Sequence, residues 1–453
     1  MFATPATLSL LFFVYIRPQE LIPGLEHVPL LYLLVALALV ALALDVRLGY
    51  VRIQNNPLLP WALAHMAWCL LSMAVFARYA LITQGVALAV AFILFTVLSQ
   101  GAQTFRALTT VGVGMLALSL FVAVVGFHQG VLADLGCVRQ DEVHEDLMIP
   151  IGAVCKTTEQ CRQEHEREDL FCEKVGLLGT TSVGGRVRFR GLMQDPNELA
   201  LVSSLAVPFA FALFELRKTP LRLALAGLTY LMVGAVAFMS RSRSGQMAFA
   251  AVTAVYLLRK MRWLGLGLMV LVSIPLLLLG GRSGGEAAES AELRLGYWAA
   301  AIQMARESPL LGVGMAQFLD HQPQTAHSSM MLILGETGVP GLFFWTALMY
   351  AAFKTTLAIM RREKQPEAWP AQVWSAALLA CLTGFSVSAL FLSLTYHYLL
   401  WILLGLVGAL YAATRRHDVR LQIKFGVLDL AVVAAIDVVY VLATHIYTRS
   451  QGF

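Results

Sequence analysis

The chain has 453 residues, of which 58% are hydrophobic and only 13% are charged, with a formal net charge of +5. Soluble domains carry about 25% charged residues, so this composition excludes a water-soluble enzyme, a disordered chain and a fibrous protein. A polytopic membrane protein remains. The basic residues stand in short clusters beside apolar segments, as topology signals do, and therefore do not indicate nucleic-acid binding.

Apolar runs of helical length follow one another along the chain. A bilayer core of about 30 Å needs about 20 apolar residues per helix, and runs such as 30–44 and 264–279 lack the alternation of barrel strands. The sequence therefore predicts an all-α polytopic membrane protein with about twelve transmembrane helices, at 3–17, 28–44, 58–76, 79–98, 106–127, 197–215, 222–240, 245–258, 263–280, 328–353, 372–392 and 396–413.

The apolar segments at the two ends of the chain are the least typical spans. The first helix has no basic n-region and no cleavage site, so we expect it to be retained. The tail at 425–447 is apolar, but Asp429 and Asp437 interrupt it, which favours an interfacial helix over a thirteenth span.

The distribution of Lys and Arg predicts the orientation. One set of short loops holds seventeen of these residues, and the other holds only Arg17, Arg78, Arg241 and Arg243. The positive-inside rule then places both ends of the twelve-helix core in the cytoplasm. We expect a bacterial inner-membrane protein whose two long loops, 128–196 and 281–327, are periplasmic.

This topology gives a sequential division of the chain. Residues 1–127 carry the first five helices, and 128–196 form a periplasmic loop. Residues 197–280 carry helices six to nine, 281–327 form the second periplasmic loop, and 328–413 carry helices ten to twelve. The tail, 414–453, is cytoplasmic or interfacial.

Four of the six cysteines lie in the first long loop: Cys137, Cys155, Cys161 and Cys172. Four cysteines in one hydrophilic loop favour two disulfides in an oxidising compartment. A metal site is the alternative, but the loop has no C-x-x-C pair. The sequence leaves all three possible pairings open.

The candidate chemistry lies on the periplasmic side. The chain has no P-loop or other nucleotide-binding motif, and neither long loop has the Asp-x-Asp of metal-dependent glycosyltransferases. Arginines concentrate beside the predicted outer helix ends, where their insertion is costly and where a guanidinium can bind phosphate oxygens bidentately. Five arginines are therefore candidates for binding a diphosphate lipid headgroup: Arg188, Arg190, Arg241, Arg243 and Arg294. Snorkelling or pairing with acids is the simpler alternative.

His327 and two neighbouring features complete the candidate site. His327 opens the predicted helix ten at its outer end, where the partial positive charge of the helix disfavours imidazolium and suits a general base. Glu336 lies further along the same helix, where it has either a functional or a structural role. Asn197, in Asp195-Pro-Asn-Glu198, is expected to be a helix cap first and a ligand second.

Four motifs in order resemble one protein family. They are Arg-x-Arg-Gly before a Pro-Asn helix start, Ser240-Arg-Ser-Arg-Ser-Gly245, Pro309-Leu-Leu-Gly-Val-Gly314, and His327 followed by Glu336-Thr-Gly-Val-Pro-Gly341. The chain thereby resembles the O-antigen ligase and O-antigen polymerase superfamily of bacterial membrane glycosyltransferases, most closely the ligases. The resemblance is dense over 185–345. The four-cysteine loop is not part of the pattern.

The resemblance implies inverting glycan transfer from undecaprenyl diphosphate, without a metal or another cofactor. The acceptor is a sugar hydroxyl of lipid A–core in a ligase and a second lipid-linked glycan in a polymerase. His327 matches the essential histidine of the family, and Arg190, Arg241 or Arg243 match its outer arginines. Arg294 resembles the arginine of its second loop. Protein O-glycosylation and a lipid or solute transporter are the remaining alternatives, the last favoured only by Glu336 and the tail aspartates.

Overall fold

The computed structural model describes residues 1–20, 22, 24–140, 148–165, 167–280, 285–362 and 369–453. The chain divides into two compact units that do not follow the sequential order of helices and loops. The first unit comprises Met1–Thr7, Val35–Thr110 and Ser283–Phe453, and the second comprises Leu8–Leu34 and Val111–Arg282. Each unit is described by itself below.

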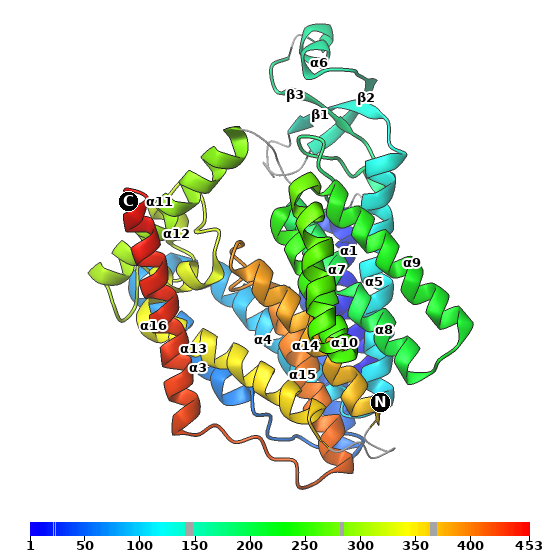
Figure 1. Ribbon diagram of the computed structural model, residues 1–453, viewed down its shortest axis with the longest axis vertical. Coiled ribbons are helices and arrows are strands. Elements are labelled where there is room, and N and C mark those ends of the chain that lie inside the picture. The colour runs from blue at the N-terminus through cyan, green and yellow to red at the C-terminus, as the bar shows by residue number, and fades with distance from the viewer. Residues whose placement is uncertain (21, 23, 141–147, 166, 281–284, 363–368) are drawn as a thin grey trace. The chain divides into compact units, whose positions relative to one another are not determined.

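The chain is largely helical, as the sequence predicts (Figure 1). The α-helices are α1 (Ala3–Ile16), α2 (Leu30–Arg47), α3 (Leu59–Phe76), α4 (Thr83–Gly101), α5 (Phe105–Val131), α6 (Thr158–His165), α7 (Pro196–Ser204), α8 (Ala206–Leu216), α9 (Pro220–Met239), α10 (Arg243–Gly280), α11 (Gly285–Glu307), α12 (Phe318–His321), α13 (Ser329–Met360), α14 (Trp369–Ala389), α15 (Tyr398–His417) and α16 (Val427–Ser450). Single 3₁₀ turns lie at Pro18–Glu20, Leu25–His27, Arg78–Ala80, Leu177–Gly179 and Gly191–Met193.

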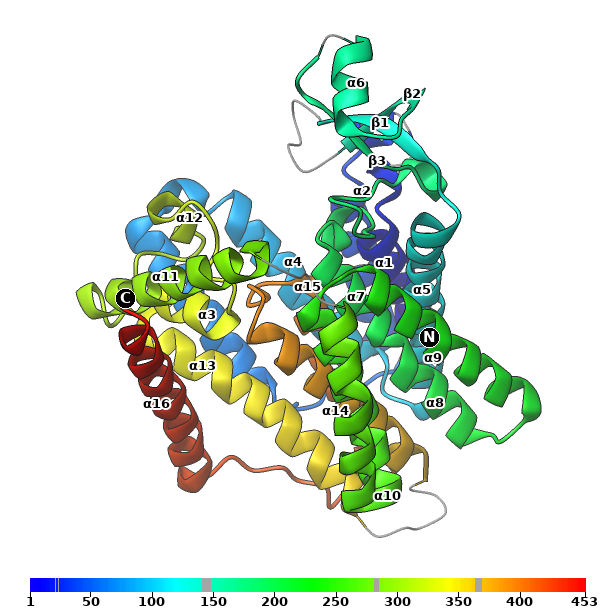
Figure 2. The same cartoon turned by 45° about the horizontal axis from the view of Figure 1, so that its top comes forward.

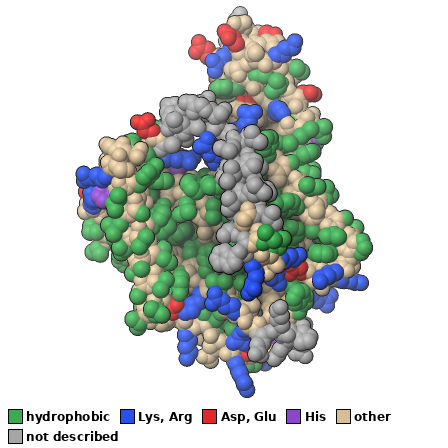
Figure 3. Space-filling model, viewed as in Figure 1, with side chains coloured by type: hydrophobic (Ala, Val, Ile, Leu, Met, Phe, Trp, Pro, Cys, Tyr) green, Lys and Arg blue, Asp and Glu red, His purple; other side chains and the backbone are tan. Residues whose placement is uncertain are grey.

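Within the described residues, ten helical segments are long and apolar enough to cross a membrane. Nine of them coincide with predicted spans, and the tenth is α16 in the tail. The protein is therefore an all-α polytopic membrane protein. Hydrophobic side chains accordingly cover much of the face shown in Figure 3.

Three predicted spans have a more complex form than expected, and a fourth is short. The span at 197–215 is two helices, α7 and α8, joined at Leu205, because Pro208 cannot continue an α-helix hydrogen-bond ladder from α7. The spans at 245–258 and 263–280 are the two limbs of α10, separated by Arg262, whose φ of 53° breaks the helix. The first helix, α1, has only 14 residues.

The core of the first unit forms where small residues let helices approach closely. In α15, which is largely buried, a Cβ on Gly405 would lie 2.7 Å from the Cβ of Leu98 in α4. Gly408, one turn later, is packed against Asn56 and Ser99 in the same way. Such contacts bring backbones together in a membrane, where apolar surface alone gives no drive for helix association.

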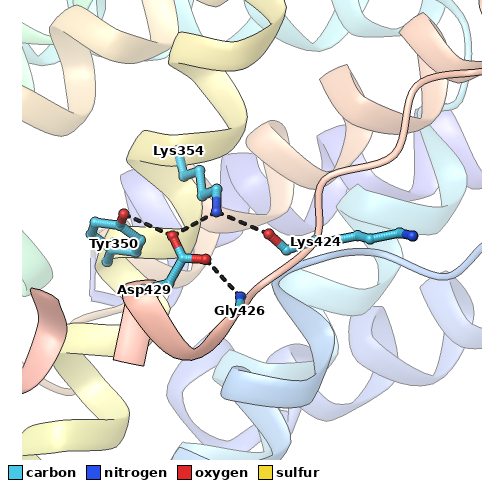
Figure 4. Close-up of polar contacts among 5 residues, drawn as sticks. All are labelled: Tyr350, Lys354, Lys424, Gly426 and Asp429. Atoms are coloured by element: carbon cyan, nitrogen blue, oxygen red, sulfur yellow. Dashed lines mark hydrogen bonds and ion pairs between the residues drawn. The ribbon is translucent and has the colours of Figure 1, made fainter. Parts of the chain in front are cut away.

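Helix α16 packs along α13 and contacts α11, and Figure 2 shows these helices beside one another. Both aspartates that interrupt the apolar tail point into this packing. Asp429 accepts hydrogen bonds from Lys354 (2.6 Å), Tyr350 (2.9 Å) and the Gly426 N–H (2.7 Å), as Figure 4 shows.

The second aspartate of α16 is held in a similar way. Asp437 accepts a hydrogen bond of 2.6 Å from Thr346 of α13. The aspartates therefore have polar partners on one helix face. By length and hydropathy, α16 qualifies as a thirteenth span rather than the expected interfacial helix.

The first long loop, in the second unit, contains a small sheet that the sequence did not predict. Strands β1 (Leu135–Gln140), β2 (Met148–Val154) and β3 (Leu170–Lys174) pair antiparallel in the order β2-β1-β3. Two disulfides form, as predicted: Cys137–Cys161 ties β1 to α6, and Cys155–Cys172 ties the chain after β2 to β3. Its buried apolar cluster consists largely of these cysteines, so the cross-links compensate for a core too small to hold the sheet.

Candidate functional site

The loop before α7 carries the first group of predicted arginines, in the second unit. Arg188 is buried, donating from Nε to the Thr181 carbonyl (3.0 Å), while its backbone N–H donates to Gln129 (2.8 Å). Arg190 donates to the backbone carbonyls of Glu20, Leu178 and Gly179 at 2.6–3.0 Å.

These contacts fix the loop from within. Burial lowers the pKa of Arg190 from its ordinary value, and a guanidinium that holds three carbonyls has few donors left for a ligand. The described geometry of Arg188 and Arg190 thus supports a structural role, in contrast to the phosphate binding that we expected from the sequence.

Helix α7 begins with a different cap from the one predicted. The side chain of Asp195 accepts the Asn197 N–H at 2.8 Å, so Asp195 is the cap and the assignment of this role to Asn197 is wrong. The side chain of Asn197 instead accepts a hydrogen bond of 3.3 Å from Arg186, whose Nε also donates to the Ser240 carbonyl (3.0 Å). Arg186, which we did not select from the sequence, thus ties the loop to α7 and to the turn after α9.

In the turn between α9 and α10, successive side chains are alternately buried and exposed. Ser240, Ser242 and Ser244 are buried, and Ser242 caps α10 by accepting the Gly245 N–H at 2.9 Å. Gly245 itself lies against Ala200, where a Cβ would overlap. The three serines and the glycine of the Ser-Arg-Ser-Arg-Ser-Gly motif therefore close the turn against α7.

The two arginines of the same turn face outward. Arg241 and Arg243 are exposed. Arg241 has a φ of 47°, a conformation that costs about 1–2 kcal/mol for a residue other than glycine, and its guanidinium contacts no hydrogen-bond or ion-pair partner among the described residues. Such an exposed cation, held in a strained backbone, is well suited to bind an anion.

In the first unit, His327 precedes Ser328, the residue before α13, and so lies just outside the helix that we expected it to open. Ser328 is the helix cap and accepts the Met331 N–H, and its hydroxyl also lies 2.9 Å from the Tyr440 hydroxyl of α16. His327 has a φ of 47°. Its Nε2 lies 3.2 Å from Gln324 Oε1, and its ring centroid lies 6.2 Å from that of Tyr297. The imidazole is partly exposed at the helix entrance.

Helix α11 carries Arg294 towards the same region. Trp298 donates from its indole to the Ala326 carbonyl at 2.9 Å, and Tyr297 meets the His327 ring. Arg294 lies one turn before these two aromatic residues, on the same helix face. Of the predicted arginines, Arg294 is therefore the one whose placement beside His327 the first unit supports.

Glu336 has a structural position within the first unit. Its Oε1 accepts the Phe318 N–H at 3.2 Å, and its backbone carbonyl accepts hydrogen bonds from Gly314 N–H and the Ser72 hydroxyl. Oε2 is buried without a hydrogen bond of good geometry among the described residues. These contacts favour the structural alternative, with backbone groups as partners.

The segment Pro309–Gly314 forms backbone hydrogen bonds with the part of α13 around Glu336. Val313 N–H donates to the Gly335 carbonyl, and Val339 N–H donates to the Pro309 carbonyl. Gly312 and Gly338 both have positive φ, and a Cβ on either would overlap the opposite backbone. The Pro309–Gly314 motif is thus a backbone clamp on the start of α13.

The structure brings together only parts of the predicted site. Arg188, Arg190, Asn197, Arg241 and Arg243 belong to the second unit, whereas His327, Arg294 and Glu336 belong to the first. Convergence of the outward arginines with His327 stays a prediction.

Comparison with known proteins identifies the middle of the chain. Residues 228–346 match the family described as O-antigen ligase, which supports the O-antigen ligase and polymerase superfamily and a membrane enzyme of glycosyltransferase type. No curated protein matches the chain.

Proposed function

Because residues 228–346 match the O-antigen ligase family, we propose that the chain moves a glycan from undecaprenyl diphosphate to a sugar hydroxyl of lipid A–core at the periplasmic face. The matched segment carries this proposal, since it runs from α9 through the exposed Arg241–Arg243 turn and α11 to His327 and the start of α13. It therefore contains the outward cations, the histidine and the clamp that holds the helix behind it.

The reaction follows from these groups. In one displacement, the acceptor oxygen bonds to the anomeric carbon while the bond from that carbon to the diphosphate breaks, which inverts the anomeric centre. His327 takes the proton of the attacking hydroxyl, and undecaprenyl diphosphate leaves with both electrons of the broken bond. The anomeric diphosphate supplies the energy of transfer, so the reaction needs no nucleotide.

The arginines stabilise the departing group. Arg241 and Arg243 are exposed on a turn that the buried serines close, so the backbone that carries both guanidinium groups is fixed before the ligand arrives. Prearranged cations stabilise a diphosphate more as its charge grows in the transition state than in the ground state. Arg294 would add a third cation beside the histidine.

The decisive experiment is transfer by the purified full chain with a lipid-linked glycan, lipid A–core and a chelator, without ATP. His327→Ala should lower kcat about 10²–10⁴-fold, the usual contribution of a general base, and Arg241→Ala about 10²–10³-fold. His321→Ala is the matched control, because this exposed histidine of α12 lies in the same segment and has no proposed role. Unchanged transfer by His327→Ala would remove it as the base.

The same assay separates the alternatives. Omission of lipid A–core leaves a polymerase able to join two lipid-linked glycans, whereas a ligase then forms no product. In cells, loss of a ligase should leave lipid A–core bare while lipid-linked polymer accumulates, and loss of a polymerase should leave single repeats attached. Movement of lipid without any new glycosidic bond would instead identify a transporter.

A further inference from the structure

A cavity of about 470 Å³ lies among α2, α3 and α4 of the first unit. Its wall is mostly apolar and includes Leu39, Leu42 and Val46 of α2 together with Leu59 and Phe95. The volume is in the range of about 300–1,000 Å³ that is typical of small-molecule sites.

The helix on one side of this cavity packs loosely. Helix α2 makes only sparse contacts with the other elements, and 22% of its apolar window is buried. Leu37 and Val40 are more than half exposed, at 52% and 55%. In a bilayer, hydrocarbon fills the apolar part of such a gap, because water finds no hydrogen-bond partners along Leu39, Leu42 and Val46.

The cavity also has a polar end. Asn56 lines it and is only 6% exposed, yet its Nδ2 has no hydrogen bond among the described residues. Its Oδ1 already accepts the Leu58 N–H at 3.0 Å. Its Nδ2 is packed against Gly408 of α15, so the polarity that Asn56 gives to this end comes without a donor aimed into the cavity.

A cation stands at the same end. Arg47, the last residue of α2, lines the cavity, is exposed and has no described hydrogen-bond or ion-pair partner. The nearest acid along the helix, Asp45, is fully buried and accepts the N–H groups of Phe2 and Ala3 at 2.8 Å each. Arg52 lies in the segment that follows. Among the residues that the structure describes, no acid pairs with the positive charge of Arg47.

We propose that this cavity binds an anionic glycerophospholipid of the leaflet at the C-terminal end of α2, which the charge distribution places on the cytoplasmic side. One acyl chain occupies the apolar space between α2 and α4. Arg47 binds the phosphate, because it lines the cavity at the end of α2. Basic pockets between transmembrane helices hold anionic headgroups by the same chemistry. The site is separate from the glycan-transfer residues and does not depend on the proposed function.

The test uses the full chain in nanodiscs that contain phosphatidylglycerol with a photoreactive acyl chain. We expect labelling of the wild-type protein to concentrate on residues 39–59 and 95–100. Ala43→Trp, which fills the cavity from α2, should abolish this labelling, whereas Leu37→Trp on the exposed face of the same helix should not. Labelling spread evenly over the lipid-facing helices would overturn the proposal without the need for any variant.

The headgroup contact is tested by titration of phosphatidylglycerol in detergent. Arg47→Ala should weaken binding about fivefold, the equivalent of about 1 kcal/mol for one basic residue at a membrane surface. Arg106→Ala is the control, because Arg106 is exposed, basic and outside the cavity. Equal binding of phosphatidylcholine, or displacement of the lipid by undecaprenyl phosphate at lower concentration, would contradict the assignment.

Discussion

Replacement of Gly312 by alanine tests the backbone clamp on α13. Gly312 has a φ of +63°, and a Cβ there would overlap the Gly335 carbonyl and the Glu336 backbone. Left-handed backbone costs alanine about 1–2 kcal/mol, and forcing apart a packed contact costs about 1–3 kcal/mol more. Because the obstructing atoms are backbone, they cannot turn aside. We expect a loss of about 2–5 kcal/mol of stability, as the sum of these two costs.

A matched glycine separates the two costs. Gly49, in the same unit, has a φ of +74°, and a Cβ added there would meet nothing within 4 Å. Gly49→Ala should therefore show only the left-handed cost of about 1–2 kcal/mol. The measurement is thermal unfolding of both variants in detergent, with glycan transfer measured in parallel below the unfolding temperature.

The expected pattern is specific. Gly312→Ala should unfold at a lower temperature than Gly49→Ala, and only Gly312→Ala should lose transfer while still folded, because it displaces the start of α13 behind His327. Equal unfolding temperatures for the two variants would show that the overlap is relieved without cost, and the clamp argument would then fail.

Three further changes test other contacts. Glu336→Gln should keep the fold because the amide oxygen still accepts the Phe318 N–H. Glu336→Leu should lower the free energy of unfolding by about 1–3 kcal/mol, because it leaves the buried Phe318 N–H without an acceptor. Thermal unfolding distinguishes the two variants. Loss of the Cys155–Cys172 bridge, with a sequence separation of 17, should cost the small sheet about 3 kcal/mol and open this loop to proteolysis. Tyr440→Phe removes the hydroxyl beside the cap of α13 and should lower kcat several-fold at unchanged KM, since a hydrogen bond contributes about 0.5–1.5 kcal/mol.

Hydropathy was sufficient to predict most of the candidate membrane-spanning helices. Apolar run length is a local property, and nine predicted spans match candidate spans in the structure. In the tail, the sequence shows Asp429 and Asp437 only as isolated charges within an apolar run. Their partners, Lys354 and Thr346, lie on a helix 75 and 91 residues away along the chain, and no local pattern shows such a pairing.

The first long loop also shows that a local pattern does not predict tertiary contacts. Four cysteines in one hydrophilic segment predicted two disulfides, but the pairing depends on which strands lie side by side. Cys137 and Cys172 are register partners of β1 and β3, yet each is bonded to a different cysteine, Cys161 and Cys155 respectively. Strand register is a tertiary property, so the sequence left three pairings open.

Within the candidate site, residue type alone did not predict which groups the side chains contact. A run of arginines before α7 suggested phosphate binding, but Arg188 and Arg190 donate to nearby carbonyls. These carbonyl oxygens come within hydrogen-bond distance only because the loop folds back on itself. The alternation in the turn after α9 was more informative, since one orientation buries the serines and exposes Arg241 and Arg243.

Backbone strain adds an observation that the sequence could not supply. Non-glycine residues rarely adopt positive φ, and where the fold enforces it the cause is often function. In the segment matched to the family, Arg241 and His327 both have a φ of 47°, and each stands beside the cap of a membrane helix. Ala316 and Arg262 share this conformation in the same segment, so strain alone selects no catalytic residue. The strain is more informative at Arg241 and His327 because of their side chains. In the proposed reaction, release of the diphosphate requires an exposed cation, and deprotonation of the hydroxyl requires an accessible imidazole.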